Sequence, residues 1–207
     1  MTDHYFSAEP SAASRPRELR VRLAGREVDV VTDGGVFSAS RLDLGTSVLL
    51  REVTAPPVEG DLLDLGCGWG PLALTFALLS PRARVWAVDV NPRARELTAA
   101  NAARLRLANV RAAAPHEVPD EVRFAAIWSN PPIRIGKEQL HGLLLRWLPR
   151  LAHGGQAYLV VQRNLGADSL HRWLAGELAS GELASGDGWS IERAGSAKGF
   201  RVLQISR

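Results

Sequence analysis

The tripeptide Asn130-Pro131-Pro132 is the part of this sequence whose residue types permit the most specific chemistry. The Asn130 side-chain oxygen and the Pro131 carbonyl, held by the fixed φ angles of two prolines, can accept both hydrogens of one NH₂ group. Two such acceptors would turn the lone pair of a conjugated amine toward a sulfonium methyl group and stabilise the charge that develops on nitrogen. The tripeptide therefore predicts methyl transfer to a planar amino group, with a rigid turn after a strand as the alternative.

A glycine-rich segment, Asp64-Leu-Gly66-Cys67-Gly68-Trp-Gly70, indicates a cofactor site. It follows an apolar run directly, and glycines there let the backbone approach a ligand closely. A dinucleotide-binding fold spaces its glycines G-x-G-x-x-G, whereas the spacing here is G-x-G-x-G with Pro71 next. This departure favours a nucleoside-amino-acid cofactor without phosphate over NAD, and a tight strand-to-helix turn is the structural alternative.

Asp89 ends the next apolar run, 19 residues beyond Gly70. A carboxylate at that position can accept hydrogen bonds from the vicinal hydroxyls of a ribose, which supports an adenosine-type ligand. His116, in a loop further on, either borders the adenine or belongs to an ordinary surface loop. The residues of this part of the sequence that we expect to bind the cofactor are Asp64, Gly66, Cys67, Gly68, Gly70, Asp89, Val90 and His116.

These residues must be positioned by an α/β fold, because apolar runs alternate with helical segments from residue 61 onward. Strands are predicted at 62–65, 85–90, 110–113, 124–129 and 157–162. Helices are predicted from Pro71, from Pro92 with Asn91 as its cap, and over 138–148, ending at or just before Pro149. Two further strands, 189–192 and 200–205, would close the sheet with an antiparallel hairpin.

Ahead of this domain the sequence predicts a flexible arm over residues 1–17 and a hairpin with a connecting segment over 18–60, so that the main domain covers 61–207. Alternating residues on either side of Gly25 indicate the hairpin. A tandem Gly-Glu-Leu-Ala-Ser sequence at 176–180 and 181–185 is typical of a tolerated insertion where a helix ends in a surface loop.

The formal net charge of +3 and the sequence pI near 9.6 suit an anionic partner such as RNA. The indication is weak, because only Lys137 and Lys198 are lysines and base composition alone can enrich arginine. Clusters such as Arg15, Arg17, Arg20 and Arg22 either contact nucleic acid or form a solvated face.

Several other functions are disfavoured by composition. The single cysteine and the spacing of the five histidines predict no metal site. The sequence has no apolar run of the length that a membrane span or a secretion signal needs, so we expect a cytoplasmic protein without membrane contact. Its oligomeric state is not evident, and a monomer is slightly favoured.

Four segments together resemble the methyltransferase small domain family, typified by bacterial guanine-N2 ribosomal RNA methyltransferases. They are Gly35-Val-Phe37-Ser38, Leu42-Asp43-Leu-Gly45-Thr46, the glycine-rich segment, and Ser129 to Pro132 followed by Gly136. The resemblance runs over most of residues 35–163. It implies a Rossmann-like class I methyltransferase fold, with a mostly parallel seven-stranded sheet and an antiparallel C-terminal strand, and S-adenosylmethionine as the methyl donor.

The same resemblance implies guanine N2 of ribosomal RNA as the methyl acceptor, free or in a ribosomal subunit. Thr46 would lie near the methionine end of the cofactor, and Asn130, Pro131 and Pro132 would grip the target amine. Phe37, Ile133, Arg134 and Lys137 would contact the substrate. Alternatives are methylation of adenine N6 or of a protein glutamine amide, a catalytically silent cofactor-dependent RNA-binding module, and, least favoured, an NAD oxidoreductase.

Overall fold

The computed structural model describes residues 13–181, 183 and 188–207 of the chain. Most of the predicted arm, residues 1–12, lies outside the described residues. So do parts of the second tandem repeat, of which 182, 184 and 185 are not described.

The first element is the predicted hairpin, which forms a separate two-stranded antiparallel sheet from β1 (Arg17–Leu23) and β2 (Arg26–Thr32). Its two-residue turn, Ala24-Gly25, has φ angles of 49° and 77°. Positive φ at both turn residues matches the twist of paired strands. The hairpin prediction is confirmed.

The other seven strands form a mostly parallel sheet of order β5-β4-β3-β6-β7-β9-β8. Their bounds are β3 Asp61–Leu65, β4 Arg84–Val88, β5 Val110–Ala113, β6 Phe124–Ser129, β7 Leu151–Gln162, β8 Ser190–Ala197 and β9 Phe200–Ser206. β9 pairs antiparallel with both β7 and β8. The predicted fold class, with its reversed final strand, is confirmed.

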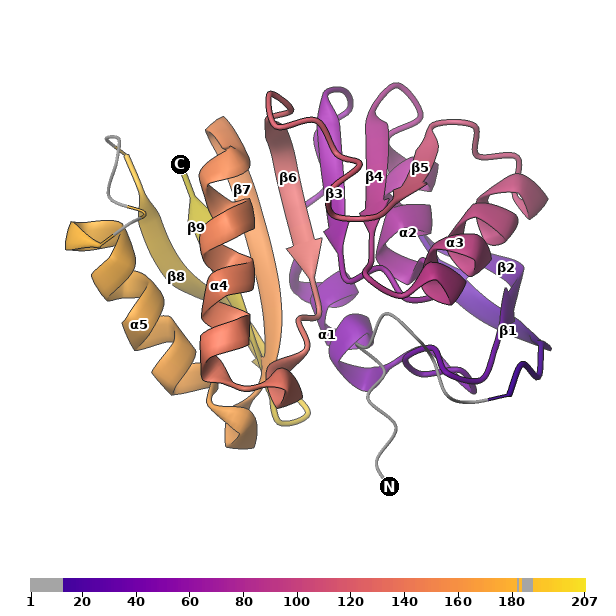
Figure 1. The fold of residues 1–207 in the computed structure, drawn as a ribbon, viewed down its shortest axis with the longest axis horizontal. Helices are drawn as coiled ribbons and strands as arrows, with labels where there is room; N and C mark the ends of the chain where they lie inside the picture. Colours follow the sequence, from indigo (N-terminus) through magenta and orange to yellow (C-terminus); the bar gives the residue numbers. More distant parts are fainter. Residues whose placement is uncertain (1–12, 182, 184–187) are drawn as a thin grey trace. The chain divides into compact units, whose positions relative to one another are not determined.

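The chain divides into two compact units, of which unit 1 is Met1–Asp43 and Ala55–Val122. Within it β3 pairs in parallel with β4, and β4 with β5, while helices α2 (Pro71–Leu79) and α3 (Pro92–Arg104) cover these strands (Figure 1). Both helices begin at a proline, as predicted. The Asn91 side chain accepts a hydrogen bond of 3.0 Å from the Arg93 amide and so caps α3.

A buried amide, Asn101 of α3, attaches the hairpin to the rest of unit 1. Its side chain accepts a hydrogen bond of 2.7 Å from the Val31 amide and donates bonds of 2.9 Å to the carbonyls of Val31 and Trp69. Because a buried amide without partners is destabilising, these three bonds link β2 firmly to α3 and to the glycine-rich segment.

Unit 2 comprises Leu44–Thr54 and Arg123–Arg207. Its helices are α1 (Leu44–Glu52), α4 (Lys137–Trp147) and α5 (Ala167–Ser180), with short 3₁₀ turns η1 (Ile133–Ile135), η2 (Leu148–Arg150) and η3 (Arg163–Leu165). In Figure 1, α4 and α5 lie across one face of β7, β9 and β8. α1 packs on the opposite face of the sheet. The Tyr158 side chain of β7 is hydrogen-bonded to Thr54, just beyond α1, whereas Val161 faces α4 and α5. Because successive strand residues point to alternate faces, these two side chains lie on opposite sides of β7.

Three elements of unit 2 differ from the sequence prediction. β8 extends to Ala197, whereas the sequence predicted a strand that ends at residue 192. α1 lies where the sequence predicted a connecting segment. Gly45, Thr46 and Ser47, in its first turn, are weak helix formers, so local preference does not predict a helix there. The helix is stabilised by its packing on β7, β8 and β9. β7 begins at Leu151 rather than at 157, since it continues through Gly154 and Gly155 past an irregularity in its pairing with β6. Glycines normally argue against a strand interior.

Candidate functional site

The glycine-rich segment turns sharply as it leaves β3. The amides of Gly66 and Cys67 both donate to the Val88 carbonyl, at 2.8 and 3.1 Å. Gly66 and Gly68 have φ angles of 81° and 56°, in the left-handed region that favours glycine. A Cβ atom added at Gly66 would meet nothing within 4 Å, so the backbone there faces open space, as close approach of a ligand requires.

Gly70, predicted with the cofactor group, also has a packing role. A Cβ atom at Gly70 would lie 2.9 Å from Oγ1 of Thr98 on α3, and the φ angle of Gly70 is 95°. The Thr98 hydroxyl in turn donates to the Gly68 carbonyl at 3.0 Å. The absence of a side chain at Gly70 therefore lets α3 fix the position of the glycine-rich segment.

Asp64, at the end of β3, is a buried carboxyl group with one free oxygen. Its Oδ2 atom accepts a hydrogen bond of 2.9 Å from the Ala73 amide, whereas Oδ1 is buried without a hydrogen-bond partner among the described residues. Burial raises the pKa of Asp64 to about 8, although the Ala73 bond partly opposes the shift. An unsatisfied buried acceptor is costly unless a ligand supplies the donor.

Asp89, just after β4, holds the segment from the other side. Its carboxylate accepts hydrogen bonds from the amides of Gly68, at 3.0 Å, and Asn91, at 2.9 Å. Burial raises the pKa of Asp89, and these bonds oppose the shift. Each carboxylate oxygen retains a lone pair, so the group can still accept hydrogen bonds from ribose hydroxyls.

The other predicted cofactor and substrate residues of unit 1 differ in exposure. Cys67 is buried, and burial raises the pKa of its thiol, which excludes a reactive thiolate. Val90 is 44% exposed, next to the buried Asp89, and His116 is exposed. Phe37 is 37% exposed, and its carbonyl would lie 4.0 Å from a Cβ atom at Gly68, so its segment lies beside the glycine-rich segment.

In unit 2, Asn130 follows the last residue of β6 and is half-buried, whereas Pro131 and Pro132 are buried. The Asn130 Nδ2 atom donates a hydrogen bond of 3.1 Å to Oγ1 of Thr46 on α1. This bond restricts rotation of the Asn130 amide and leaves Oδ1 pointing away from Thr46. Sequence reasoning missed this pair, since 84 residues separate its members and no spacing pattern links them.

The two prolines form a tight turn that sets the direction of the Pro131 carbonyl. Pro132 has φ −74° and ψ 79°, and the Ile133 amide donates to the Pro131 carbonyl at 2.9 Å. These values define an inverse γ-turn. The carbonyl keeps one lone pair for a further donor.

The remaining predicted substrate residues follow this turn. Ile133 is half-buried, and Arg134 and Lys137 are exposed. Gly136 stands between them with φ 103° and ψ 157°, a conformation essentially restricted to glycine. Thr46, expected among the cofactor residues, lies in unit 2 with Asn130.

The chain matches the methyltransferase small domain family over residues 27–189. It is 35% identical to YbxB of Bacillus subtilis over 172 residues, which cover 82% of this chain and 86% of that protein. It is 35% identical to ribosomal RNA small subunit methyltransferase C of Pseudomonas aeruginosa over 188 residues, or 89% of this chain and 56% of that enzyme.

Among solved structures, a similar fold is found in a T. thermophilus 16S rRNA N2 methyltransferase (RsmC) in complex with AdoMet and guanosine. The TM-score is 0.75 at 23% sequence identity, over 96% of this chain and 52% of that one. The chain thus spans about half the length of these two ribosomal RNA methyltransferases.

The fold is that of a class I methyltransferase. The chain belongs to the methyltransferase small domain family, as the match over more than half its length shows. The predicted cofactor, S-adenosylmethionine, is confirmed at this level. Unit 1 fits it, because the open backbone at Gly66 gives close access and the free Oδ1 atom of Asp64 can accept a hydrogen from the methionine ammonium group.

Every helix in the described part of the chain is too short or too polar to span a bilayer. Within the same part of the chain, no three His, Cys, Asp or Glu residues are grouped so that they could hold a metal ion.

The raised pKa of Asp64 predicts a pH effect on stability. Between an unfolded-state pKa of about 3.9 and the folded-state pKa of about 8, the folded chain keeps a proton that the unfolded chain releases. The free energy of unfolding should therefore fall as pH rises through this interval. In Asp64→Asn that fall should be smaller but not absent, because burial also raises the pKa of Asp89. Urea unfolding from pH 5 to 8 measures both slopes, and equal slopes would contradict the assignment.

Proposed function

We propose that this protein transfers the methyl group of S-adenosylmethionine to the N2 amino group of a guanine in ribosomal RNA. The observation that carries the proposal is the fixed amide of Asn130, whose Nδ2 atom is bonded to Thr46. Its Oδ1 atom and the Pro131 carbonyl are two rigid acceptors suited to one NH₂ group. The family membership and the names of the relatives support ribosomal RNA as the carrier of that group.

The chemistry requires no strong base. The lone pair of guanine N2 is conjugated with the ring, and acceptors on both N–H bonds favour the geometry in which that lone pair points at the methyl carbon. As the N–C bond forms and the S–C bond breaks, positive charge moves from sulfur to nitrogen, and the two oxygens stabilise it there. The extra proton then passes from the nitrogen to solvent water, because the nitrogen is strongly acidic once it carries the charge.

In this proposal the residues of unit 1 hold the methyl donor. Asp64 Oδ1 accepts a hydrogen from the methionine ammonium group, Asp89 binds the ribose hydroxyls, and Val90 and His116 border the adenine. Gly66, Cys67 and Gly68 pass close to the cofactor with their backbone. Phe37, Ile133, Arg134 and Lys137 contact the RNA, and the base must leave its stack to reach Asn130. The proposed partner is ribosomal RNA or a ribosomal subunit in the cytoplasm.

The direct test is transfer of isotope-labelled methyl groups to ribosomal RNA from a strain that lacks the gene, followed by mass analysis of the nucleosides. N2-methylguanosine is the expected product. N6-methyladenosine, or label in a release factor instead of RNA, would replace the proposed acceptor while leaving the methyltransferase class intact.

Asp89→Ala should weaken S-adenosylmethionine binding by about 1.5 to 3 kcal/mol, because charge-assisted hydrogen bonds to the ribose are lost. Isothermal calorimetry measures the effect, with thermal melting to account for the lost bonds to Gly68 and Asn91. Glu96→Ala is the matched control, since Glu96 is an exposed carboxylate on α3 of the same unit. If the two variants bind the cofactor with equal affinity, Asp89 does not contact the ribose.

Asn130→Ala should lower kcat about a hundredfold or more, because one preorganised acceptor is missing as charge develops on nitrogen. Cofactor affinity should change little. Asn130→Asp keeps an acceptor and should retain more activity than the alanine variant. Single-turnover methyl transfer compares the two, and a wild-type rate in Asn130→Ala would reduce the tripeptide to a structural turn.

Thr46→Val should lower kcat about 5- to 30-fold, the equivalent of about 1 to 2 kcal/mol for one hydrogen bond, because the Asn130 amide can then rotate. Thr46→Ser keeps the hydroxyl and should stay near the wild-type rate. Rates at saturating cofactor separate this positioning role from cofactor binding. If Thr46→Val loses only cofactor affinity, Thr46 is a cofactor ligand and does not orient Asn130.

A further inference from the structure

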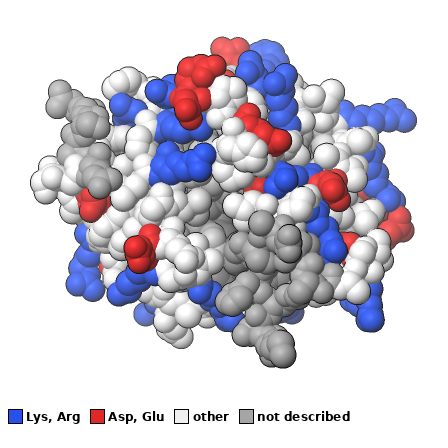
Figure 2. Space-filling view, in the orientation of Figure 1, with Lys and Arg blue, Asp and Glu red and all other residues white. Residues whose placement is uncertain are grey.

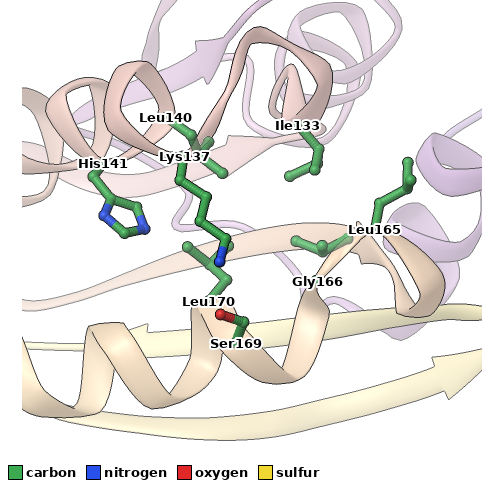
Figure 3. A pocket seen from close by; sticks show the side chains of 9 residues that line it. Ile133, Lys137, Leu140, His141, Leu165, Gly166, Ser169 and Leu170 are labelled. Carbon is green, nitrogen blue, oxygen red and sulfur yellow. The ribbon is translucent and has the colours of Figure 1, made fainter.

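A small hollow of about 70 Å³ lies in unit 2 between α4 and α5 (Figure 3). Its lining begins at Ile133, the residue directly after Pro132, and includes none of Asn130, Pro131 and Pro132. The hollow is therefore a neighbour of the acceptor tripeptide and is not part of it.

Most of the hollow's lining is aliphatic. The apolar side chains come from η1, α4, β7, η3 and α5, and they are Ile133, Leu140, Val161, Leu165 and Leu170. Leu165 is 40% exposed, so part of this wall is open to solvent. Such a wall suits a flat group that can exchange water for apolar contact.

One positive charge is combined with this wall. The Lys137 side chain extends across the hollow, and its ammonium group lies near the Ser169 hydroxyl (Figure 3). His141, stacked on Trp173 with ring centroids 3.6 Å apart, also lines the hollow. Burial lowers the pKa of His141, Glu177 opposes the shift and Lys137 adds to it. No acidic residue belongs to the lining.

Two more cations lie close in sequence to lining residues: Arg134 follows Ile133, and Arg163 is two residues before Leu165. Arg134 of η1 and Arg163 of η3 are exposed, and neither forms an ion pair within the part of the chain that the structure describes. By contrast, Arg20 and Arg104 of unit 1 are paired with Asp29 and Glu18. On the face shown in Figure 2, basic and acidic side chains are interspersed, so unpaired cations are more informative here than the total charge.

We infer that this hollow binds a nucleotide of single-stranded RNA next to the nucleotide that is methylated. The base lies against the aliphatic wall, and its phosphate contacts Lys137, with Arg134 and Arg163 at the adjoining phosphates. A nucleotide carries a flat base and a phosphate close together, as an apolar wall beside the Lys137 ammonium group requires. An acidic peptide carries its apolar and charged groups on separate side chains and fits this arrangement less well. The inference rests on the proposed function for the identity of the neighbouring nucleotide.

Charge is tested by fluorescence anisotropy with a labelled single-stranded RNA hexamer, which requires no methyl transfer. Lys137→Gln should weaken binding several-fold and reduce the slope of log affinity against log salt by about 0.7, the value for one phosphate contact in single strands. Lys198→Gln is the matched control, since Lys198 is the only other lysine and does not line the hollow. Equal effects of the two substitutions, or none, would overturn the inference.

The base is tested by filling the hollow. Ser169→Phe should weaken hexamer binding about tenfold, whereas Ser180→Phe, at the exposed end of the same helix, should not. An abasic hexamer should bind wild type and Ser169→Phe equally. If Ser169→Phe leaves hexamer binding unchanged, or weakens the abasic probe as much, no base occupies the hollow.

Methyl transfer separates this inference from the proposed function. With ribosomal RNA, Ser169→Phe should raise KM and leave kcat unchanged, and transfer to free guanosine should be unaffected. A loss with guanosine as well would assign the hollow to the target base and overturn the inference. Absence of N2-methylguanosine with the wild-type protein would overturn the proposed function, while the hexamer results would still stand.

Discussion

Burial of two carboxyl groups at the ends of neighbouring parallel strands is the constraint on which unit 1 depends. Asp64 and Asp89 each accept hydrogen bonds from backbone amides of the segments that follow β3 and β4. Removing a carboxylate from water is costly, and amide donors offset only part of that cost. The carboxyl oxygens that hold the glycine-rich segment can therefore accept further hydrogen bonds. A binding site needs such unused acceptors, whereas a turn that is only structural does not.

The tripeptide Asn130-Pro131-Pro132 in unit 2 is held in place by different interactions. It contains no charge, and its rigidity comes from two prolines, an inverse γ-turn and the bond between Asn130 and Thr46. A neutral amide can stabilise developing positive charge without first binding a cation of its own. Because the methyl donor is already a sulfonium, orientation contributes more to such a reaction than basicity does.

Substrate recognition has to come from outside that tripeptide. In the proposed function, Asn130 and Pro131 recognise an NH₂ group but not the polymer that carries it, and their conformation would suit several planar amines. The aliphatic hollow and its unpaired cations would add a second nucleotide to what is recognised. In this view the tripeptide determines the chemistry and the segment from Ile133 onward determines the acceptor.

The sequence by itself determined the order of most elements and the types of residue at the site. Alternating apolar runs predicted β3 to β6 to within about two residues, and Pro71, Pro92 and Asn91 marked the starts of α2 and α3, because these signals act over a few neighbouring residues. The glycine spacing and the Asn-Pro-Pro tripeptide indicated the two kinds of chemistry for the same reason.

Only the tertiary structure decided what depends on distant partners. α1 exists because β7, β8 and β9 cover it, and β7 runs through two glycines that local preference would exclude. Thr46 meets Asn130 across 84 residues, Gly70 is required by Thr98 on another helix, and the hollow is assembled from five separate elements. Such contacts produce no local pattern in the sequence, because they are stabilised by burial and hydrogen bonding between residues that are distant along the chain.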